Sequence, residues 1–121
     1  GRSRRKTPGC NAEISVSDRE AAVTDTKNLI AATEGADISG KFLTGASPGV
    51  ISLFFANTHY PDFESYIFAI AEAMRYEYET VTNAGIMLQL DCPDLGMGRH
   101  IQYADLSLAD FRNGPNFMSR P

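Results

Sequence analysis

The clearest pattern in the chain is a stripe of apolar residues at helical spacing between positions 62 and 84. Steps of three and four separate its members, so they share one face of a helix and leave most charged residues off it. Asp62 is suited to cap the start of this helix, and Gly85 can end it in the left-handed conformation at low cost. We therefore predict a long helix over residues 62–84, whose apolar stripe is Phe63, Tyr66, Ile67, Ile70, Met74, Tyr78 and Val81.

A short and almost continuously apolar run, residues 86–90, follows this helix and stops at Asp91-Cys92-Pro93-Asp94. Such a run is typical of a parallel strand that is buried on both faces. A long helix, a glycine turn and a buried strand make half of a parallel β/α unit. Because barrels built from such units keep their chemistry at the carboxyl ends of the strands, Asp91 is the first candidate functional residue.

The first half of the chain carries shorter patterns. Residues 13–16 and 41–44 are strand candidates, and Ser17-Asp18-Arg19-Glu20 resembles a capping box in which Ser17 accepts from the Glu20 amide. That box predicts a helix over residues 18–33, which Gly35 ends. Residues 50–55 are apolar throughout, and their pattern does not separate a buried strand from a short buried helix, although Pro48 suits the first turn of a helix.

The ends of the chain are less regular. Residues 1–12 are predicted to be a basic tail or loop, and residues 94–102 a glycine-rich loop that carries Arg99 and His100. Ser107 is suited to cap a short helix that fails at Asn113-Gly114-Pro115. Residues 113–121 continue no pattern, so residues 13–112 form the predicted structured segment.

Charge is unevenly distributed along the chain. The formal net charge is −4, and four of the eleven Lys and Arg residues lie within Arg2–Lys6. The remaining seven, set against 15 Asp and Glu, leave the rest of the chain with a net charge of −8. A body this acidic repels the phosphates of a nucleic acid, and no apolar stretch reaches the roughly 20 residues of a membrane span. We therefore expect no nucleic-acid partner and no membrane partner.

The two cysteines, Cys10 and Cys92, lie far apart and form no Cys-x-x-Cys pair, and no histidine lies at metal-ligand spacing from either. This usage favours a reducing compartment, and we predict the cytoplasm. Cys92 is interpreted as an inert thiol rather than as a nucleophile or a metal ligand, because no residue at workable spacing would activate it.

Several stretches, in this order and spacing, are similar to the cobalamin-independent methionine synthase family and more closely to its shorter single-barrel relatives. The similarity runs from about Gly45 to Arg112, and a weaker one extends back to about Cys10. The matching stretches are Ala46-Ser47-Pro48-Gly49-Val50, His59-Tyr60-Pro61, residues 69–78, Asn83-Ala84-Gly85, residues 88–95, Gly98-Arg99-His100 and residues 104–108.

The resemblance implies an α/β fold: part of a (β/α)8 TIM-type barrel, with about three parallel strands and their flanking helices. It also implies a catalytic zinc that activates the thiol of homocysteine to accept a methyl group from a folate. On this resemblance Asp91 contacts the bound amino acid, and Phe55 lies near the position that stacks on the folate. Arg99 and His100 would bind an anionic substrate over the barrel mouth, although a loop Arg-His pair is more often simply solvated.

The chain also departs from the family. Its zinc ligands lie beyond the similar region, the motif of a His followed closely by a Cys is absent, and a complete barrel needs ~250 residues. We therefore expect a fragment that is inactive alone, with no catalytic residue and no metal ligand of its own. Two alternatives stay open. One is a non-catalytic module that forms homo-oligomers through its open strand edges. The other is a lyase-type small-molecule enzyme on a similar barrel.

Overall fold

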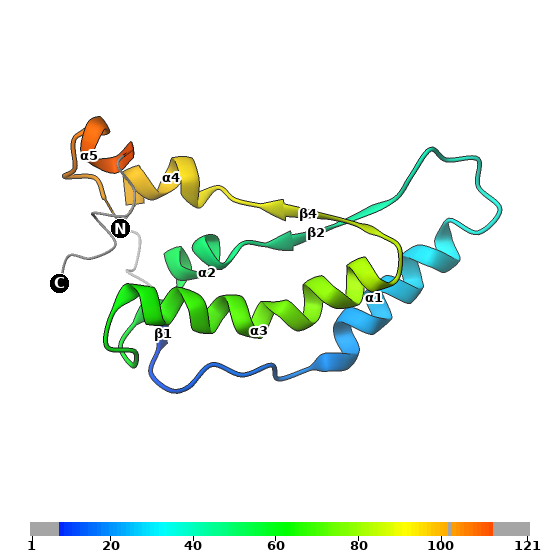
Figure 1. The fold of residues 1–121 in the computed structure, drawn as a ribbon, viewed down its shortest axis with the longest axis horizontal. Coiled ribbons are helices and arrows are strands. Elements are labelled where there is room, and N and C mark those ends of the chain that lie inside the picture. The colour runs from blue at the N-terminus through cyan, green and yellow to red at the C-terminus, as the bar shows by residue number, and fades with distance from the viewer. Residues whose placement is uncertain (1–7, 102, 113–121) are drawn as a thin grey trace, which may run out of the picture.

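The computed structural model describes residues 8–101 and 103–112 of the 121-residue chain. Strands and helices alternate from β1 to α4, and a second short helix, α5, follows (Figure 1). The elements are β1 (Gly9–Cys10), α1 (Arg19–Ala32), β2 (Phe42–Ala46), α2 (Pro48–Phe54), β3 (Ala56–Asn57), α3 (Phe63–Asn83), β4 (Met87–Asp91), α4 (Asp94–Ile101) and α5 (Leu108–Arg112).

The strands form two small parallel sheets, in which β1 pairs with β3 and β2 pairs with β4. The longer pair is in register from Phe42 opposite Met87 to Ala46 opposite Asp91. The chain crosses from β2 to β4 through α2, β3 and α3, and α3 runs along the strand pair (Figure 1). The mixed α/β class and the parallel β/α unit are therefore confirmed. Within the described residues the strands close no barrel.

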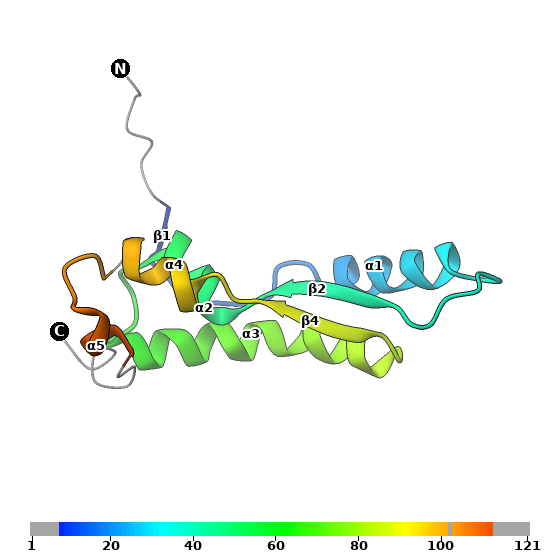
Figure 2. The ribbon, with the colours of Figure 1, turned by 90° about the horizontal axis from the view of Figure 1, so that it is seen from above.

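The predicted long helix is confirmed with its two ends. The carboxylate of Asp62 accepts from the amide of Ser65 at 2.6 Å, and Gly85 has a φ of +72°. Tyr66, Ile70 and Val81, all from the predicted stripe, are at most 4 % exposed. Helix α3 contacts both α1 and α2, and Figure 2 shows the β2–β4 pair between α1 and α3 in that view. The core therefore lies along the stripe.

The ambiguous apolar run 50–55 is helical up to Phe54. Helix α2 begins with Pro48 in its first turn, and the side chain of Ser47 caps it by accepting from the amide of Val50 at 3.1 Å. Capping and the preset φ of proline both favour a helix at this point, and the uniform apolar run alone carried no such information.

The N-terminal expectations were wrong in two details. Residues 13–16 pair with no strand of the described chain, and Gly9–Cys10 pairs with β3 instead. Helix α1 is capped by Asp18 rather than by Ser17, since the Asp18 carboxylate accepts from the amides of Glu20 and Ala21 at 2.9 and 3.2 Å. Serine and aspartate are both good N-cap residues, so the two possible helix starts differ by only one residue.

Strand β4 lies where it was predicted, but it is not buried on both faces. Met87 is 69 % exposed, because α3 covers only one face of the strand pair, and Leu90 on the covered face is still 44 % exposed. The opposite face carries the even-numbered residues of β2 and the odd-numbered residues of β4, and all of these are exposed.

The loop predicted over residues 94–102 was also wrong, because Asp94–Ile101 form helix α4. Gly98 is buried in this helix, where a Cβ on it would make only ordinary contacts, 3.9 Å from Leu53 and from Phe111. The short final helix is confirmed, since the Ser107 hydroxyl accepts from the amide of Asp110 at 3.1 Å.

The predicted basic tail falls largely on residues 1–7, which lie outside the described residues, as do residue 102 of the predicted loop and the tail 113–121. Of the first twelve residues, Pro8 to Ala12 are described and include β1. Among the helices of the described part of the chain, none is both long and apolar enough to cross a membrane.

Candidate functional site at the carboxyl end of the strand pair

Strands β2 and β4 end side by side, and each leads into a helix at the same edge. Ala46 is opposite Asp91, and the amide of Ser47 donates to the carbonyl of Asp91 at 3.0 Å, which continues the ladder past the strands. Helix α2 starts at Pro48 and helix α4 at Asp94. The side chain of Asp91 is exposed at this edge, which is where parallel β/α units present functional groups.

A hydrogen-bonded pair joins the two helix starts. The hydroxyl of Ser47 donates to Oδ1 of Asp94 at 2.8 Å while it accepts from the amide of Val50 at 3.1 Å. Ser47 is only 5 % exposed, so both partners are needed to satisfy its hydroxyl inside the protein. The pair holds a carboxylate, that of Asp94, at the start of α4.

Gly49 makes room for that carboxylate. A Cβ on Gly49 would lie 2.0 Å from Oδ2 of Asp94 and 2.5 Å from its Cγ, far inside van der Waals contact. Only glycine therefore fits at this position while Asp94 stays bonded to Ser47. The close approach brings α2 and α4 together, and these helices contact each other in the structure.

Tyr78 closes the side of the site that faces α3. Its hydroxyl donates to the carbonyl of Ala46, the last residue of β2. Burial raises the pKa of Tyr78, and Glu77 and Cys92 add to the rise, so the phenol stays a neutral donor at physiological pH. Cys92 is a half-buried free thiol whose sulfur lies 3.7 Å from the carbonyl of Leu90.

The four residues predicted to bind substrate lie on different segments of the fold. Asp91 is at the strand end, whereas Arg99 and His100 lie in the last turn of α4. Phe55 follows α2 and lines a cavity between α1, β2 and α3, whose lining does not include the other three. Nε of Arg99 is buried without a hydrogen-bond partner among the described residues.

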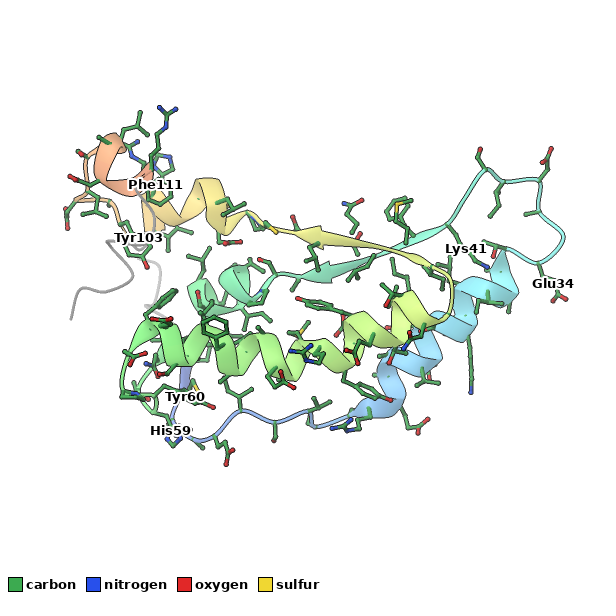
Figure 3. All side chains as sticks on the ribbon, viewed as in Figure 1. Glu34, Lys41, His59, Tyr60, Tyr103 and Phe111 are labelled. Atoms are coloured by element: carbon green, nitrogen blue, oxygen red, sulfur yellow. The ribbon has the colours of Figure 1, made fainter. Side chains whose placement is uncertain are left out.

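His59 and Tyr60, which belong to the resemblance, lie in the loop that leads into α3, where Figure 3 labels them. The hydroxyl of Tyr60 accepts from the amide of Ile14 at 2.9 Å, and its ring centroid lies 5.8 Å from that of Tyr66. His59 packs edge-on against the Tyr60 ring at 5.0 Å. These contacts give both residues a structural role.

Sequence reasoning missed Ser47, Gly49 and Asp94 as a unit. A signal existed for one of them, since a serine before a proline is typical of a helix cap. The hydrogen bond from Ser47 to Asp94 joins residues 47 positions apart, and no local sequence pattern predicts it.

The site is rich in acceptors, which suits it to hold an ammonium group or another hydrogen-bond donor. The residues that would hold the zinc implied by the resemblance do not assemble here. Within the described residues, no group of three or more His, Cys, Asp or Glu side chains could hold a metal ion. The zinc of the resemblance therefore has no ligand set in this part of the chain.

Comparison of the chain with protein families, with curated proteins and with solved structures finds no match. The resemblance to methionine synthases thus remains a prediction from the sequence.

Proposed function

We propose that this chain is part of a barrel methyltransferase of the cobalamin-independent methionine synthase type and forms the part that orients a thiol amino acid. One observation carries the proposal: the parallel β2–β4 pair ends at an exposed carboxylate, Asp91, between two helix starts. A βαβ unit with α3 along one face is the building block of such a barrel. The α/β unit is in this view a partial barrel that further strands would complete.

In this proposal Asp91 accepts hydrogen bonds from the ammonium group of the substrate. Asp94 lies three residues further on, with Oδ1 bonded to Ser47, and adds negative charge at the same edge. Charge-assisted hydrogen bonds of this kind are stronger than neutral ones. The residues would bind and orient a thiol such as homocysteine, while a methyl-folate would supply the methyl group.

Two further parts of the proposal rest on the sequence resemblance. In them Phe55 stacks on the folate, and Arg99 with His100 binds an anionic group. The cytoplasm is the proposed compartment, since Cys10 and Cys92 are both free thiols.

The test is an NMR titration of the ¹⁵N-labelled chain with L-homocysteine. We expect shifts confined to the amides around Ala46, Ser47 and Asp91, and an affinity at least about tenfold lower in Asp91→Asn. The desamino analogue 4-mercaptobutyrate should bind as weakly, because it has no ammonium group. Asp37→Asn, in the exposed loop between α1 and β2, is the matched control and should bind as the wild type does.

Shifts elsewhere, or unchanged binding in Asp91→Asn, would refute the proposal. Equal binding of homoserine would show that the thiol is not selected and would favour the lyase-type alternative.

A second candidate function is self-association, in which the partner is a second copy of the chain. One pair of exposed apolar side chains favours it. Phe42 and Met87 are register partners on the face of the sheet that α3 leaves uncovered, and they are 55 % and 69 % exposed. Parallel sheets are normally covered on both faces, so this pair is suited to pack against another copy.

Sedimentation velocity over about a hundredfold range of concentration tests this candidate. A dimer is expected, and Met87→Lys should shift it to monomer. Phe68→Lys is the matched control, because Phe68 is 65 % exposed on α3. A wild-type chain that stays monomeric, or an equal effect of both substitutions, would rule the candidate out.

A further inference from the structure

A cavity of about 680 Å³ lies between β2, α1, α3 and the extended segment that leads from β1 to α1. Its volume is within the ~300–1,000 Å³ of typical ligand sites. Side chains of α3 and of the two strands supply apolar lining, chiefly Leu43, Ile70, Met74, Val81 and Leu88. The candidate site at the strand ends does not contribute to this lining, so the cavity is a separate feature.

The cavity runs along the backbone edge of β2. Leu43 and Thr44 both line it, although successive residues of a strand point to opposite faces of a sheet. A space that touches both residues must lie beside the edge of the strand. No strand of the described chain pairs with β2 on this edge, and β4 pairs with its opposite edge.

The ladder shows which backbone groups face the cavity. The carbonyl of Lys41 accepts from Met87, and the amide of Ser47 donates to Asp91. In a parallel ladder, alternate residues turn both backbone groups toward the same neighbour. The odd-numbered residues of β2 therefore bond to β4, and Thr44 turns its N–H and C=O toward the free edge.

The wall opposite β2 is also an extended backbone. Five consecutive residues, 14–18, line the cavity, and residues 13–16 belong to no sheet. This segment is held from its other side, where the Ile14 amide donates to Tyr60. Two extended edges thus border one cavity whose floor is apolar.

The charge of the lining is one-sided. Asp18, Asp25 and Glu77 line the cavity, and no Lys, Arg or His of the described residues does. A ligand that fills this space gains from a positive charge next to these carboxylates.

We propose that the cavity binds an extended peptide segment of a partner protein, apolar with a basic residue, which adds to β2 as a third strand. Strand addition supplies backbone hydrogen bonds at the Thr44 edge, and alternate side chains enter the apolar floor over α3. The five residues of β2 match a peptide of about 17 Å at ~3.3 Å per residue. The basic side chain lies toward the carboxylates of Asp25 and Glu77. The proposal does not depend on the methyltransferase function.

Three synthetic peptides, each acetylated, amidated and long enough to span β2, test the proposal by NMR titration. The first alternates valine and lysine, the second valine and glutamate, and the third is the first with methylated backbone nitrogens. The first should bind and slow hydrogen exchange of the Thr44 amide. The second and third should each bind about tenfold more weakly, through charge repulsion and through loss of two or so backbone hydrogen bonds.

A pair of variants tests the same edge from the side of the protein. Thr44→Pro removes the N–H that faces the cavity but leaves the ladder to β4, because proline is tolerated on a free edge. It should lower the affinity for the valine–lysine peptide about tenfold. Thr44→Val keeps the N–H and should bind as the wild type does. The methylated peptide gives an independent answer if Thr44→Pro does not fold.

Equal binding of all three peptides would overturn the proposal, because the backbone and the charge would then play no part. Absence of binding by the valine–lysine peptide would also overturn it. A third outcome would overturn it as well: the chain forms a dimer that Thr44→Pro abolishes and that the peptide does not displace. The occupant of the cavity would then be a second copy of the chain.

Discussion

Gly49→Ala is the most informative substitution, because one added methyl group acts directly on the link between α2 and α4. The new Cβ would lie 2.0 Å from Oδ2 of Asp94, so the carboxylate has to leave its place. Its hydrogen bond to Ser47, 2.8 Å long, is then lost. Ser47 is 5 % exposed, and its hydroxyl remains inside the protein without that acceptor.

The expected change in the free energy of unfolding follows from three effects, one stabilising and two destabilising. Glycine to alanine inside an unhindered helix stabilises by about 0.5–1 kcal/mol. Against this stand overpacking, about 1–3 kcal/mol, and loss of a hydrogen bond to a charged group, about 1.5–3 kcal/mol. We expect Gly49→Ala to lower the free energy of unfolding by about 2–3 kcal/mol, because part of the overpacking relaxes when the Asp94 side chain rotates.

The sign should reverse when Asp94 is removed first. In the Asp94→Ala background no carboxylate meets the new Cβ, so Gly49→Ala should stabilise by about 0.5–1 kcal/mol. The coupling between the two substitutions is then about 3 kcal/mol. Gly96→Ala in α4 is the matched control, since a Cβ there meets nothing within 4 Å, and it should stabilise in both backgrounds.

Urea unfolding followed by circular dichroism at 222 nm measures these free energies for the wild type, the two single variants and the double variant. If Gly49→Ala has the same effect with and without Asp94, the two side chains do not compete for one space and the reasoning is refuted. A stabilising Gly49→Ala in the wild type refutes it as well.

The remaining predictions concern two side chains, Asp62 and Tyr66. The hydrogen bond from Ser65 holds the pKa of Asp62 below its usual value. The ionised Asp62 carboxylate therefore stabilises the fold above about pH 4, and this contribution is lost as the pH falls through the lowered pKa. Asp62→Asn keeps a cap that does not ionise, so its urea midpoints, measured against pH, should show a flatter acid branch. Tyr66→Phe removes a 2.6 Å hydrogen bond to the carbonyl of Phe55 and should cost about 1–2 kcal/mol in urea unfolding, and an unchanged midpoint would contradict this. Burial raises the pKa of Tyr66, so its contribution is present below about pH 10 and is lost as the pH rises through the raised value; absorbance at 295 nm should show a later tyrosinate transition in the wild type than in Tyr66→Phe.

The sequence by itself determined the elements whose signals are local. The stripe of α3, the cap at Asp62 and the turn at Gly85 all depend on residues within a few positions of one another, and the structure confirms each. The strand that ends at Asp91 follows from the same kind of signal. The local pattern alone was therefore sufficient to place Asp91 at a strand end.

Tertiary structure decided the features that depend on distant neighbours. Residues 13–16 have the pattern of a strand, but a strand needs a partner, and this segment pairs with none in the described chain. The glycines of α4 resemble those of a loop, although both lie inside a helix and Gly98 is buried there. The exposure of Met87 depends on which elements cover the sheet, and the sequence of β4 does not determine those elements.

The candidate site likewise contains one feature that local sequence predicts and others that only tertiary structure sets. Asp91 is a local prediction, whereas the bond between Ser47 and Asp94 joins residues 47 positions apart, and the space that Gly49 leaves exists only once α2 and α4 meet. Local propensities act within a few residues of the chain, but register, burial and close approach are set by which segments the whole fold brings together. The sequence therefore identified the carboxylate, and only the packing of the two helices showed what surrounds it.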